Sequence, residues 1–220
     1  MREVDAVRRI VTAAPTVTPV PTWNFFQGSL VAHYSFDDGT AAEDSDGSLD
    51  GTITGATATT GRDGSGALAF DGTDDYVEFP SAVTADILGN SDRTLCLWLQ
   101  RDTTSWRDGV FFSYGDDDTA MGSFTLRSNC CSENVLVERH DHGNNHDVSV
   151  SGFDDGGWHH YCNTYDGTDW RLYFDGAVVH TDTVALDTGA DSPFTLGRRN
   201  SGGWMVADYG IVEAKDYYVA

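Results

Sequence analysis

The stretch WHHYCNTYDGTDWRLYFDGAVVHTD, residues 158–182, decides the fold of this chain. Its apolar and aromatic residues alternate with polar ones, which is the pattern of strands. The run DGTD and the later pair Asp175-Gly176 interrupt the alternation, and such residues favour tight turns. The stretch therefore predicts a three-stranded antiparallel meander. Alternation along its first strand separates two sets of side chains: His159, Tyr161 and Asn163 on one face, and Trp158, His160, Cys162 and Thr164 on the other.

Similar runs continue through the chain after residue 28, separated by Asp-Gly or Gly-Thr turns. The run TLCLWLQR (94–101) is apolar on both faces and predicts a central strand. Roughly a dozen short strands at this spacing are typical of an all-β, two-sheet antiparallel sandwich. The other expected strands are 30–36, 51–59, 67–72, 75–80, 109–115, 122–128, 134–139, 158–165, 169–174, 177–184, 193–198 and 204–219.

The charge is one-sided, because 35 acidic residues face 13 basic ones and the net charge is −22. Such a field repels nucleic acid and anionic membranes, whereas divalent cations and neutral sugars remain suitable partners. An acidic surface suits a halophilic or marine source, although a GC-rich genome with Asp-rich loops explains it equally. No apolar run approaches the ~20 residues that span a bilayer, so we expect no membrane insertion.

The first 28 residues differ from the rest and predict a separate N-terminal arm, helical or extended, before a domain at 29–220. Apolar residues from Val4 to Val11 fall on one helical stripe, and three prolines follow between 15 and 21. The arm has two readings: a frayed tail, or a segment that docks on a larger assembly. It lacks the apolar core of a secretory signal. Either such a signal was removed, or the protein leaves the cell by another route, such as within a virion.

The four cysteines include no CxxC pair, which argues against a zinc ribbon. Cys96 and Cys162 fall in strand-like runs and read as plain buried thiols. Cys130 and Cys131 are adjacent in a loop-like stretch, where one of them could form a bridge. The sequence leaves the pairing of all four open.

WHHYCNTYDGTDWRLYFDGAVV resembles the signature meander of laminin-G-like, concanavalin A-like lectin/glucanase jelly rolls, W-H-H-V-A-x-x-Y-D-G-x-x-x-x-L-Y-x-D-G. LVAHYSFDDG, GRDGSGALAFDGTDDYVEFP and TLCLWLQR agree with the same family in the same order. The resemblance covers about residues 29–215. It implies a jelly roll whose first and last strands lie side by side. The closing run MVADYGIVEAKDYYVA departs from the family pattern, because it keeps Asp208 but loses the next acid.

A calcium site is expected from the loop EDSDG at 43–47, which offers carboxylates at alternate positions. Related domains place calcium between this loop and an acid of the closing strand. The resemblance therefore implies Asp44, Asp46 and Asp208 as metal ligands. The alternative is an ordinary solvated acidic turn, which is also our interpretation of 74–75 and 116–118.

Ligand contacts are expected from aromatic residues in loops, because aromatic faces stack on sugar rings. The candidates are Trp106, Trp158, Trp170, Trp204 and Tyr114. Trp106 in SWRDG is preferred because this run reads as a loop between strands, whereas Trp98 is expected to pack inside the sandwich. His140 and His142 lie in RHDHGNNHD, which could contact a ligand or clasp a transition metal. Its glycine and asparagines favour a mobile hairpin loop instead.

An enzyme is not expected, because jelly-roll glycosidases carry paired carboxylates such as E-x-D-x-E and the chain has no such spacing. The sequence favours a non-catalytic, calcium-stabilised module that binds a glycan or glycoprotein surface outside the cell. The alternative is a structural virion component (a decoration, turret, spike or tail-fibre protein), receptor-binding in a halophilic host. Residues 1–28 would then anchor it in a homo-oligomer or virion assembly. A glycoside hydrolase or lyase is the third candidate.

Overall fold

The structure is a computed structural model. It describes residues 30–39, 42, 48–101, 109–116, 118–128, 135–139, 145–150, 152, 155–201, 204–207 and 211–219, with only the backbone for 135–139, 145–147, 200–201, 204–207 and 211–219. The predicted arm, 1–28, lies outside these residues. Within the described part, no helix is long and apolar enough to cross a membrane.

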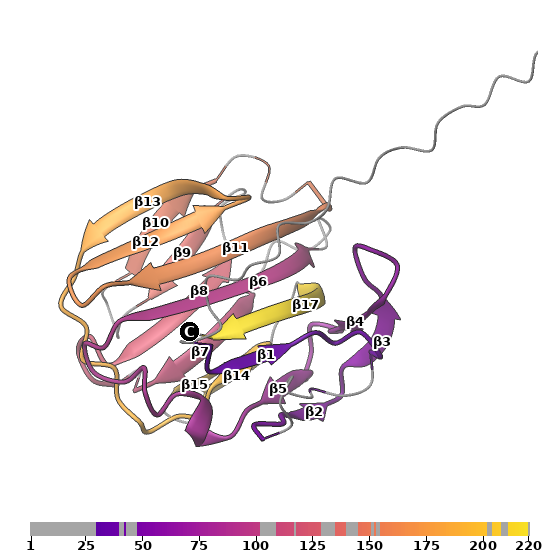
Figure 1. Ribbon diagram of the computed structural model, residues 1–220, viewed down its shortest axis with the longest axis horizontal. Helices are drawn as coiled ribbons and strands as arrows, with labels where there is room; N and C mark the ends of the chain where they lie inside the picture. The colour runs from indigo at the N-terminus through magenta and orange to yellow at the C-terminus, as the bar shows by residue number, and fades with distance from the viewer. Residues whose placement is uncertain are drawn as a thin grey trace, which may run out of the picture.

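Two antiparallel sheets, one in front of the other, make up the described part of the chain (Figure 1). The eight-stranded sheet runs in the order β13 (Ala177–Thr183), β12 (Asp169–Phe174), β11 (Trp158–Tyr165), β6 (Arg93–Arg101), β17 (Ile211–Val219), β4 (Gly66–Ala69) and β3 (Thr57–Thr60), and β1 (Ala32–Tyr34) also pairs with β17. The seven-stranded sheet runs β10 (Asn145–Ser149), β9 (Val135–Arg139), β8 (Ser123–Ser128), β7 (Val110–Gly115), β14 (Thr195–Leu196), β5 (Tyr76–Glu78) and β2 (Thr52–Thr54). A separate ribbon pairs β15 (Arg198–Ser201) with β16 (Trp204–Ala207), and Ser81–Val83 form a 3-10 turn.

The expected all-β sandwich is confirmed, and so is the adjacency of the first and last strands. β1 pairs with β17 in antiparallel register, from Ala32 opposite Val219 to Tyr34 opposite Tyr217. The predicted meander is formed by β11, β12 and β13, and β6 is central, between β11 and β17. The first and last strands of the described chain are therefore neighbours in the same sheet.

The core lies between the sheets because each strand turns alternate residues inward. β6 buries Leu95, Leu97 and Leu99, while the residues between them are only half-buried. β11 buries Tyr161, Asn163 and Tyr165, so the predicted division of its two faces is confirmed. Large aromatic residues fill the space opposite, namely Phe111, Phe112 and Phe124 of the seven-stranded sheet and Phe194 just before β14. The outer face of β6 is half-buried, whereas β7 and the short β14 have every residue buried.

Two expected strands are divided. Residues 51–59 form β2 and β3 in different sheets, because Gly55 between them has a φ of 77°. A Cβ on Gly55 would meet Asp75 Oδ1 at 1.8 Å, so this corner requires glycine. Residues 204–219 likewise form β16 and β17. The run RHDHGNNHD, residues 139–147, was expected to form a hairpin loop. Its last part, with His146 and Asp147, belongs to β10, which pairs with β9.

Cys96 and Cys162 form a disulfide, so their interpretation as separate thiols is wrong. They are directly opposite one another in β6 and β11, with Cα atoms 4.0 Å apart and a sequence separation of 66. The bridge lies on the face of the sheet that points away from the core, because both positions alternate with buried neighbours. Cys130 and Cys131 lie outside the described residues.

Candidate functional site

The outer face of the eight-stranded sheet, opposite the core, carries an aromatic cluster where β6 and β11 pair. Trp98 and His160 are cross-strand neighbours, and their ring centroids are 5.1 Å apart. The next pair along the strands is Gln100 and Trp158. All four side chains are half-buried. Because the inner positions of both strands already fill the core, the fold itself does not require aromatic residues here.

Arg62 reaches this cluster from the loop between β3 and β4. Its guanidinium lies 4.3 Å from the centroid of the Trp98 ring, and Arg62 is exposed. The loop therefore crosses the position of β17, which separates β4 from β6 in the sheet. We call Arg62, Trp98, Gln100, Trp158 and His160 the Trp98 patch.

The rim of the patch is fixed by polar contacts from the segment that leads into β11. Gln100 donates a hydrogen bond of 2.6 Å from Nε2 to the carbonyl oxygen of Gly156. The backbone N–H of Gly157 donates to Asp155 Oδ1 at 2.7 Å. These bonds tie the entry to β11 onto β6, and so they hold Trp158 beside Gln100.

His159, on the opposite side of β11 from His160, lies between two carboxylates. Its Nδ1 is 2.8 Å from Asp175 Oδ2 and its Nε2 is 2.9 Å from Asp155 Oδ1. The imidazole also stacks on Phe174, with centroids 4.7 Å apart. Two carboxylate acceptors require both ring nitrogens to donate, which is the charged form of histidine.

The pKa values in this cluster follow from the same contacts. Burial acts most strongly on His159 and lowers its pKa, but the hydrogen bonds to Asp155 and Asp175 together outweigh burial, so the pKa is raised. The bond from His159, followed by that from the Gly157 N–H, lowers the pKa of Asp155. The two aspartates therefore stabilise an imidazolium that links the entry of β11 to the β12–β13 turn.

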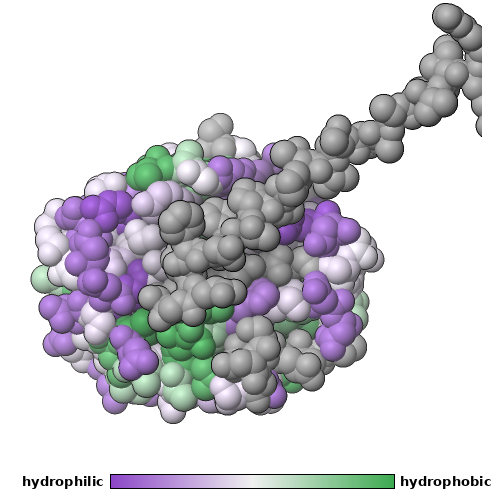
Figure 2. All heavy atoms as spheres, viewed as in Figure 1, coloured by the Kyte–Doolittle hydropathy of each residue, from purple (hydrophilic) through white to green (hydrophobic). Residues whose placement is uncertain are grey.

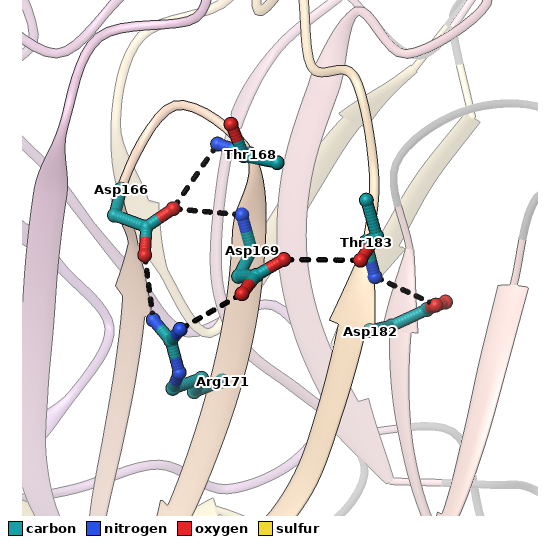
Figure 3. A network of polar contacts seen from close by, with 6 residues as sticks. All are labelled: Asp166, Thr168, Asp169, Arg171, Asp182 and Thr183. Carbon is teal, nitrogen blue, oxygen red and sulfur yellow. Dashed lines mark hydrogen bonds and ion pairs between the residues drawn. The ribbon is translucent and has the colours of Figure 1, made fainter.

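A second polar network holds the far end of the meander (Figure 3). Asp166 Oδ1 accepts the backbone N–H groups of Thr168 and Asp169, at 3.2 and 2.8 Å. Arg171 donates to Asp166 Oδ2 at 2.8 Å and to Asp169 Oδ2 at 2.9 Å. The bond from the Asp169 N–H, then that from Arg171, lowers the pKa of Asp166. Figure 2 shows hydrophilic residues over this side of the sheet, where β11, β12 and β13 lie.

Three aspartates between β4 and β5 form a compact acidic group. Asp71, Asp74 and Asp75 each offer a carboxylate oxygen, and these oxygens lie within 4.8 Å of one another. Asp75 is buried, which corrects its interpretation as a solvated loop residue. Its pKa is raised, first by desolvation. Asp75 Oδ2 and Asp71 Oδ1 accept the backbone N–H groups of Asp71 and Thr73, so these carboxylates stabilise the turn.

The structure places few of the expected site residues. Tyr114 is 1% exposed, and its hydroxyl accepts a hydrogen bond from Arg93 NH1 at 2.9 Å, so it is a core residue that a ligand does not reach. Trp170 is also a core residue, at 0% exposed, whereas Trp158 is half-buried and belongs to the Trp98 patch. The side chain of Trp204 lies outside the described residues, as do Asp44, Asp46 and Asp208 for calcium and Trp106, His140 and His142 for a ligand.

Trp98 and Arg62 were not expected at a site. Trp98 was predicted to pack inside the sandwich, but it lies on the outer face, because Leu97 and Leu99 on either side take the inner positions. Counting from these leucines would have placed Trp98 correctly. No sequence signal connects it to Arg62, which belongs to a distant turn. Together the patch offers aromatic faces and N–H donors, the groups that contact sugar rings and hydroxyls.

Comparison with protein families supports this description of the fold. The sequence model of the concanavalin A-like lectin/glucanases superfamily, the Laminin_G_3 family, matches residues 71–209. Comparison with curated proteins finds no match.

Several solved structures are similar. Domain 4 of AbnA, a GH43 extracellular arabinanase from Geobacillus stearothermophilus solved with arabinotriose, is 20% identical with a TM-score of 0.61, and the match covers 86% of this chain and 91% of that one. A Trypanosoma rangeli sialidase is 16% identical with a TM-score of 0.63, covering 87% and 30%. Botulinum neurotoxin type C, whose cell entry depends on two ganglioside molecules, is 10% identical with a TM-score of 0.60, covering 87% and 47%. This chain therefore corresponds to less than half of the matched sialidase and neurotoxin chains.

Proposed function

Because the chain belongs to the concanavalin A-like lectin/glucanases superfamily, we propose that it is a non-catalytic module that binds a glycan or a glycosylated surface. The Trp98 patch is its contact site. The observation that carries this proposal is the position of Trp98, half-buried on the outer face beside His160 and under Arg62. Similar solved chains include an arabinanase domain in complex with arabinotriose, and the proposal places this chain in the same ligand class.

Catalysis is not part of the proposal, although the similar structures include enzymes as well as binding domains. Of the described carboxylates near the patch, Asp155 and Asp175 are both bonded to His159. Asp71 and Asp75 each accept a hydrogen bond from a backbone N–H. A hydrolase would require turnover of a polysaccharide and loss of that turnover when one acid is changed. Binding without turnover is the outcome that the proposal requires.

A glycan array of the full chain tests the function, followed by calorimetry on the best ligand. We expect Trp98→Ala to weaken binding about tenfold or more, because it removes a stacking surface whose contacts are worth roughly 0.5–1.5 kcal/mol beyond area burial. Val178→Ala is the matched control, since Val178 is exposed on the edge strand β13 and is paired with Tyr173 on the same face. Trp98→Phe, which keeps an aromatic face, should bind more tightly than Trp98→Ala. Unchanged binding by both Trp98 variants would exclude this site.

Calcium at Asp44, Asp46 and Asp208 is a second part of the proposal, and it rests on the family resemblance. Repeating the array with a chelator tests it. We expect lower thermal stability and weaker binding without calcium, and no chelator effect in Asp44→Asn. A chelator effect of equal size in that variant would place the calcium elsewhere.

The virion alternative depends on residues 1–28. It predicts that the full chain is recovered in rings, fibres or capsids and that a chain beginning at residue 29 is not. Recovery of both chains as monomers that bind glycan supports the module over the assembly component.

A further inference from the structure

His159 joins two segments that border the Trp98 patch. On one side, Asp155 Oδ1 lies 2.9 Å from His159 Nε2 and also accepts the backbone N–H of Gly157 at 2.7 Å. On the other side, Asp175 Oδ2 lies 2.8 Å from His159 Nδ1, and its Oδ1 accepts the backbone N–H of His160 at 2.9 Å. Each aspartate therefore bonds to the imidazole and to the backbone of a nearby residue.

Both backbone groups lead directly to the patch. Gly157 precedes Trp158, and the carbonyl oxygen of its neighbour Gly156 accepts the 2.6 Å bond from Gln100 Nε2. The ring of His160 packs on Trp98, with centroids 5.1 Å apart. The contacts of His159 thus reach the rim of the patch through Asp155, and its aromatic centre through Asp175.

Only a charged imidazole suits this arrangement. A neutral imidazole has one N–H and one lone pair, so one of its nitrogens would face a carboxylate oxygen without a proton between them. One carboxylate must then move away. Asp175 is joined twice to the backbone of His160, because its own N–H also donates to the His160 carbonyl at 2.8 Å. Asp155 is exposed and precedes the strand, so we expect Asp155 to leave and the Gly157 N–H to lose its acceptor.

The other described groups that face His159 do not change charge near neutrality. Phe174 of β12 stacks on the imidazole, and β6 places Leu99 opposite it. Arg101, 5% exposed, follows two positions further on the same face of β6 and is permanently charged. Burial lowers the pKa of His159, but the bonds to Asp155 and Asp175 together outweigh burial, so the pKa is raised above 6.5. The imidazole is therefore charged in acid and loses its proton as the pH rises through the raised pKa.

We propose that His159 is a positioning residue of the Trp98 patch: its imidazolium holds the rim in place, and loss of its proton releases the rim and weakens glycan binding. We base this on the function proposed above, because the patch is the contact site assigned there. Binding is then strongest in acidic solution and falls as His159 becomes neutral.

Fluorine NMR of the full chain labelled with 5-fluorotryptophan tests the positioning role without a ligand. Trp98→Phe and Trp158→Phe assign the two patch resonances, and the imidazole of His159 is titrated by proton NMR over the same pH range, from pH 5 to pH 9. We expect the Trp158 resonance to shift with the midpoint of His159, because the segment before Trp158 is released. Hydrogen exchange of the Gly157 N–H should accelerate above the same midpoint.

Two variants remove the pH response in different ways. His159→Gln can donate from only one side of its amide, as a neutral imidazole does, so at pH 5 it should give the patch resonances that the wild type gives at pH 9. Asp155→Asn keeps an oxygen for the Gly157 N–H and offers an N–H to a neutral imidazole, so its resonances should shift little between pH 5 and pH 9. This smaller change keeps the test decisive if His159→Gln does not fold.

His180→Gln is the matched control. It removes a histidine of the same meander whose ring packs on Trp170, 5.0 Å away between centroids, rather than on the patch. This variant should keep the wild-type pH response of Trp158. Patch resonances that do not follow His159, or a full pH response in His159→Gln, would assign the effect to another group such as His160 and would overturn the inference.

The glycan array, run on the wild type at pH 5 and at pH 9, tests the effect on binding. We expect signals about fivefold weaker at pH 9, at the lower end of typical coupling between two sites, and similar signals at both pH values for Asp155→Asn. If the wild type binds glycans equally well or better at pH 9, the glycan function stands and this inference fails. If the resonances follow His159 but no glycan binds at either pH, the positioning role stands and the proposed function fails.

Discussion

The two Asp-Gly turns of the β11–β12–β13 meander begin with the same dipeptide and are held by different cations. Asp166-Gly167 joins β11 to β12, and Arg171 bonds to its aspartate. Asp175-Gly176 joins β12 to β13, and His159 bonds to its aspartate. Asp175 and Gly176 both have positive φ, 48° and 80°, whereas in the first turn Gly167 has a φ of 82°.

The comparison shows that the sequence of a turn specifies its backbone conformation but not how its stability depends on pH. An arginine keeps its charge at every physiological pH, so the first turn has a permanent partner. A histidine loses its charge near neutrality, so the second turn has a partner that depends on pH. His159, which bonds to Asp175 of the second turn, also bonds to Asp155 before β11, and so it links this turn to the rim of the Trp98 patch.

The largest expected effect comes from Asp175→Ala. The variant loses the acceptor for the His160 N–H, at 2.9 Å, as well as the partner of His159. Alanine also tolerates positive φ less well than aspartate. We expect the free energy of unfolding at pH 5 to fall by roughly 2 kcal/mol in urea denaturation followed by circular dichroism. Asp175→Asn keeps an acceptor and should lose less. Equal loss in both variants would show that the carboxylate charge, and not the hydrogen-bond acceptor, accounts for the whole effect.

Gly176→Ala should cost somewhat less, about 1–2 kcal/mol, because an alanine must adopt left-handed φ there. No atom lies within 4 Å of its added Cβ, so the cost is conformational. Gly167→Ala has a similar φ and should give a similar loss in the same denaturation experiment. A much larger loss at Gly167 would show that its neighbours Asn90 and Asp92, at 3.4 Å, obstruct the side chain.

The pH dependence of stability should separate the two turns. The pKa of His159 is raised in the folded chain, so its contribution is fully present below its ordinary value, near 6.5, and is lost as pH rises through the folded pKa. We expect the wild-type chain to lose on the order of 1 kcal/mol across this range, discounted for the exposure of its aspartate partners. His159→Gln should remove this slope. A histidine NMR titration gives the pKa directly, and a value below 6.5 would contradict the prediction.

Arg171→Gln should have the smallest effect, because Asp166 is exposed and Asp169 only half-buried, so solvent screens the ion pairs. We expect a slight lowering of Tm that is the same at pH 6 and pH 8. A scanning calorimetry experiment at both pH values measures it. If the lowering of Tm differed between the two pH values, a group that titrates in this range would also contribute to the first turn, and the prediction would be wrong.

Much of the fold followed from local pattern. Alternation in residues 158–165 assigned the inner and outer faces of β11 correctly, because a strand has only two faces. Gly55 was not read as a break, since a single glycine within a β-branched run is compatible with a continuous strand. β10 was missed because its asparagine and histidine have low strand propensity, and pairing with β9 overrides it.

The site could be predicted less well, because its contacts join distant segments. Trp98 was assigned to the core as large aromatic residues usually are, although its neighbours Leu97 and Leu99 already determined the outer position. Tyr114 was expected at a ligand, but Arg93, buried nearby, needs its hydroxyl as an acceptor. Neither Arg62 on Trp98 nor the Cys96–Cys162 bridge has a sequence signal, since side-chain contacts across a sheet depend on strand order.

By itself, the sequence determined that this chain forms antiparallel strands, where the meander turns, and which residues of β11 face the core. These properties depend on the two-residue period of a strand and on the φ preferences of Asp and Gly, which act within a few residues. Only the tertiary structure decided that β17 lies between β4 and β6, and therefore that the β3–β4 loop carries Arg62 to Trp98. That choice is set by how two sheets bury a common core, a property of the whole chain rather than of any segment.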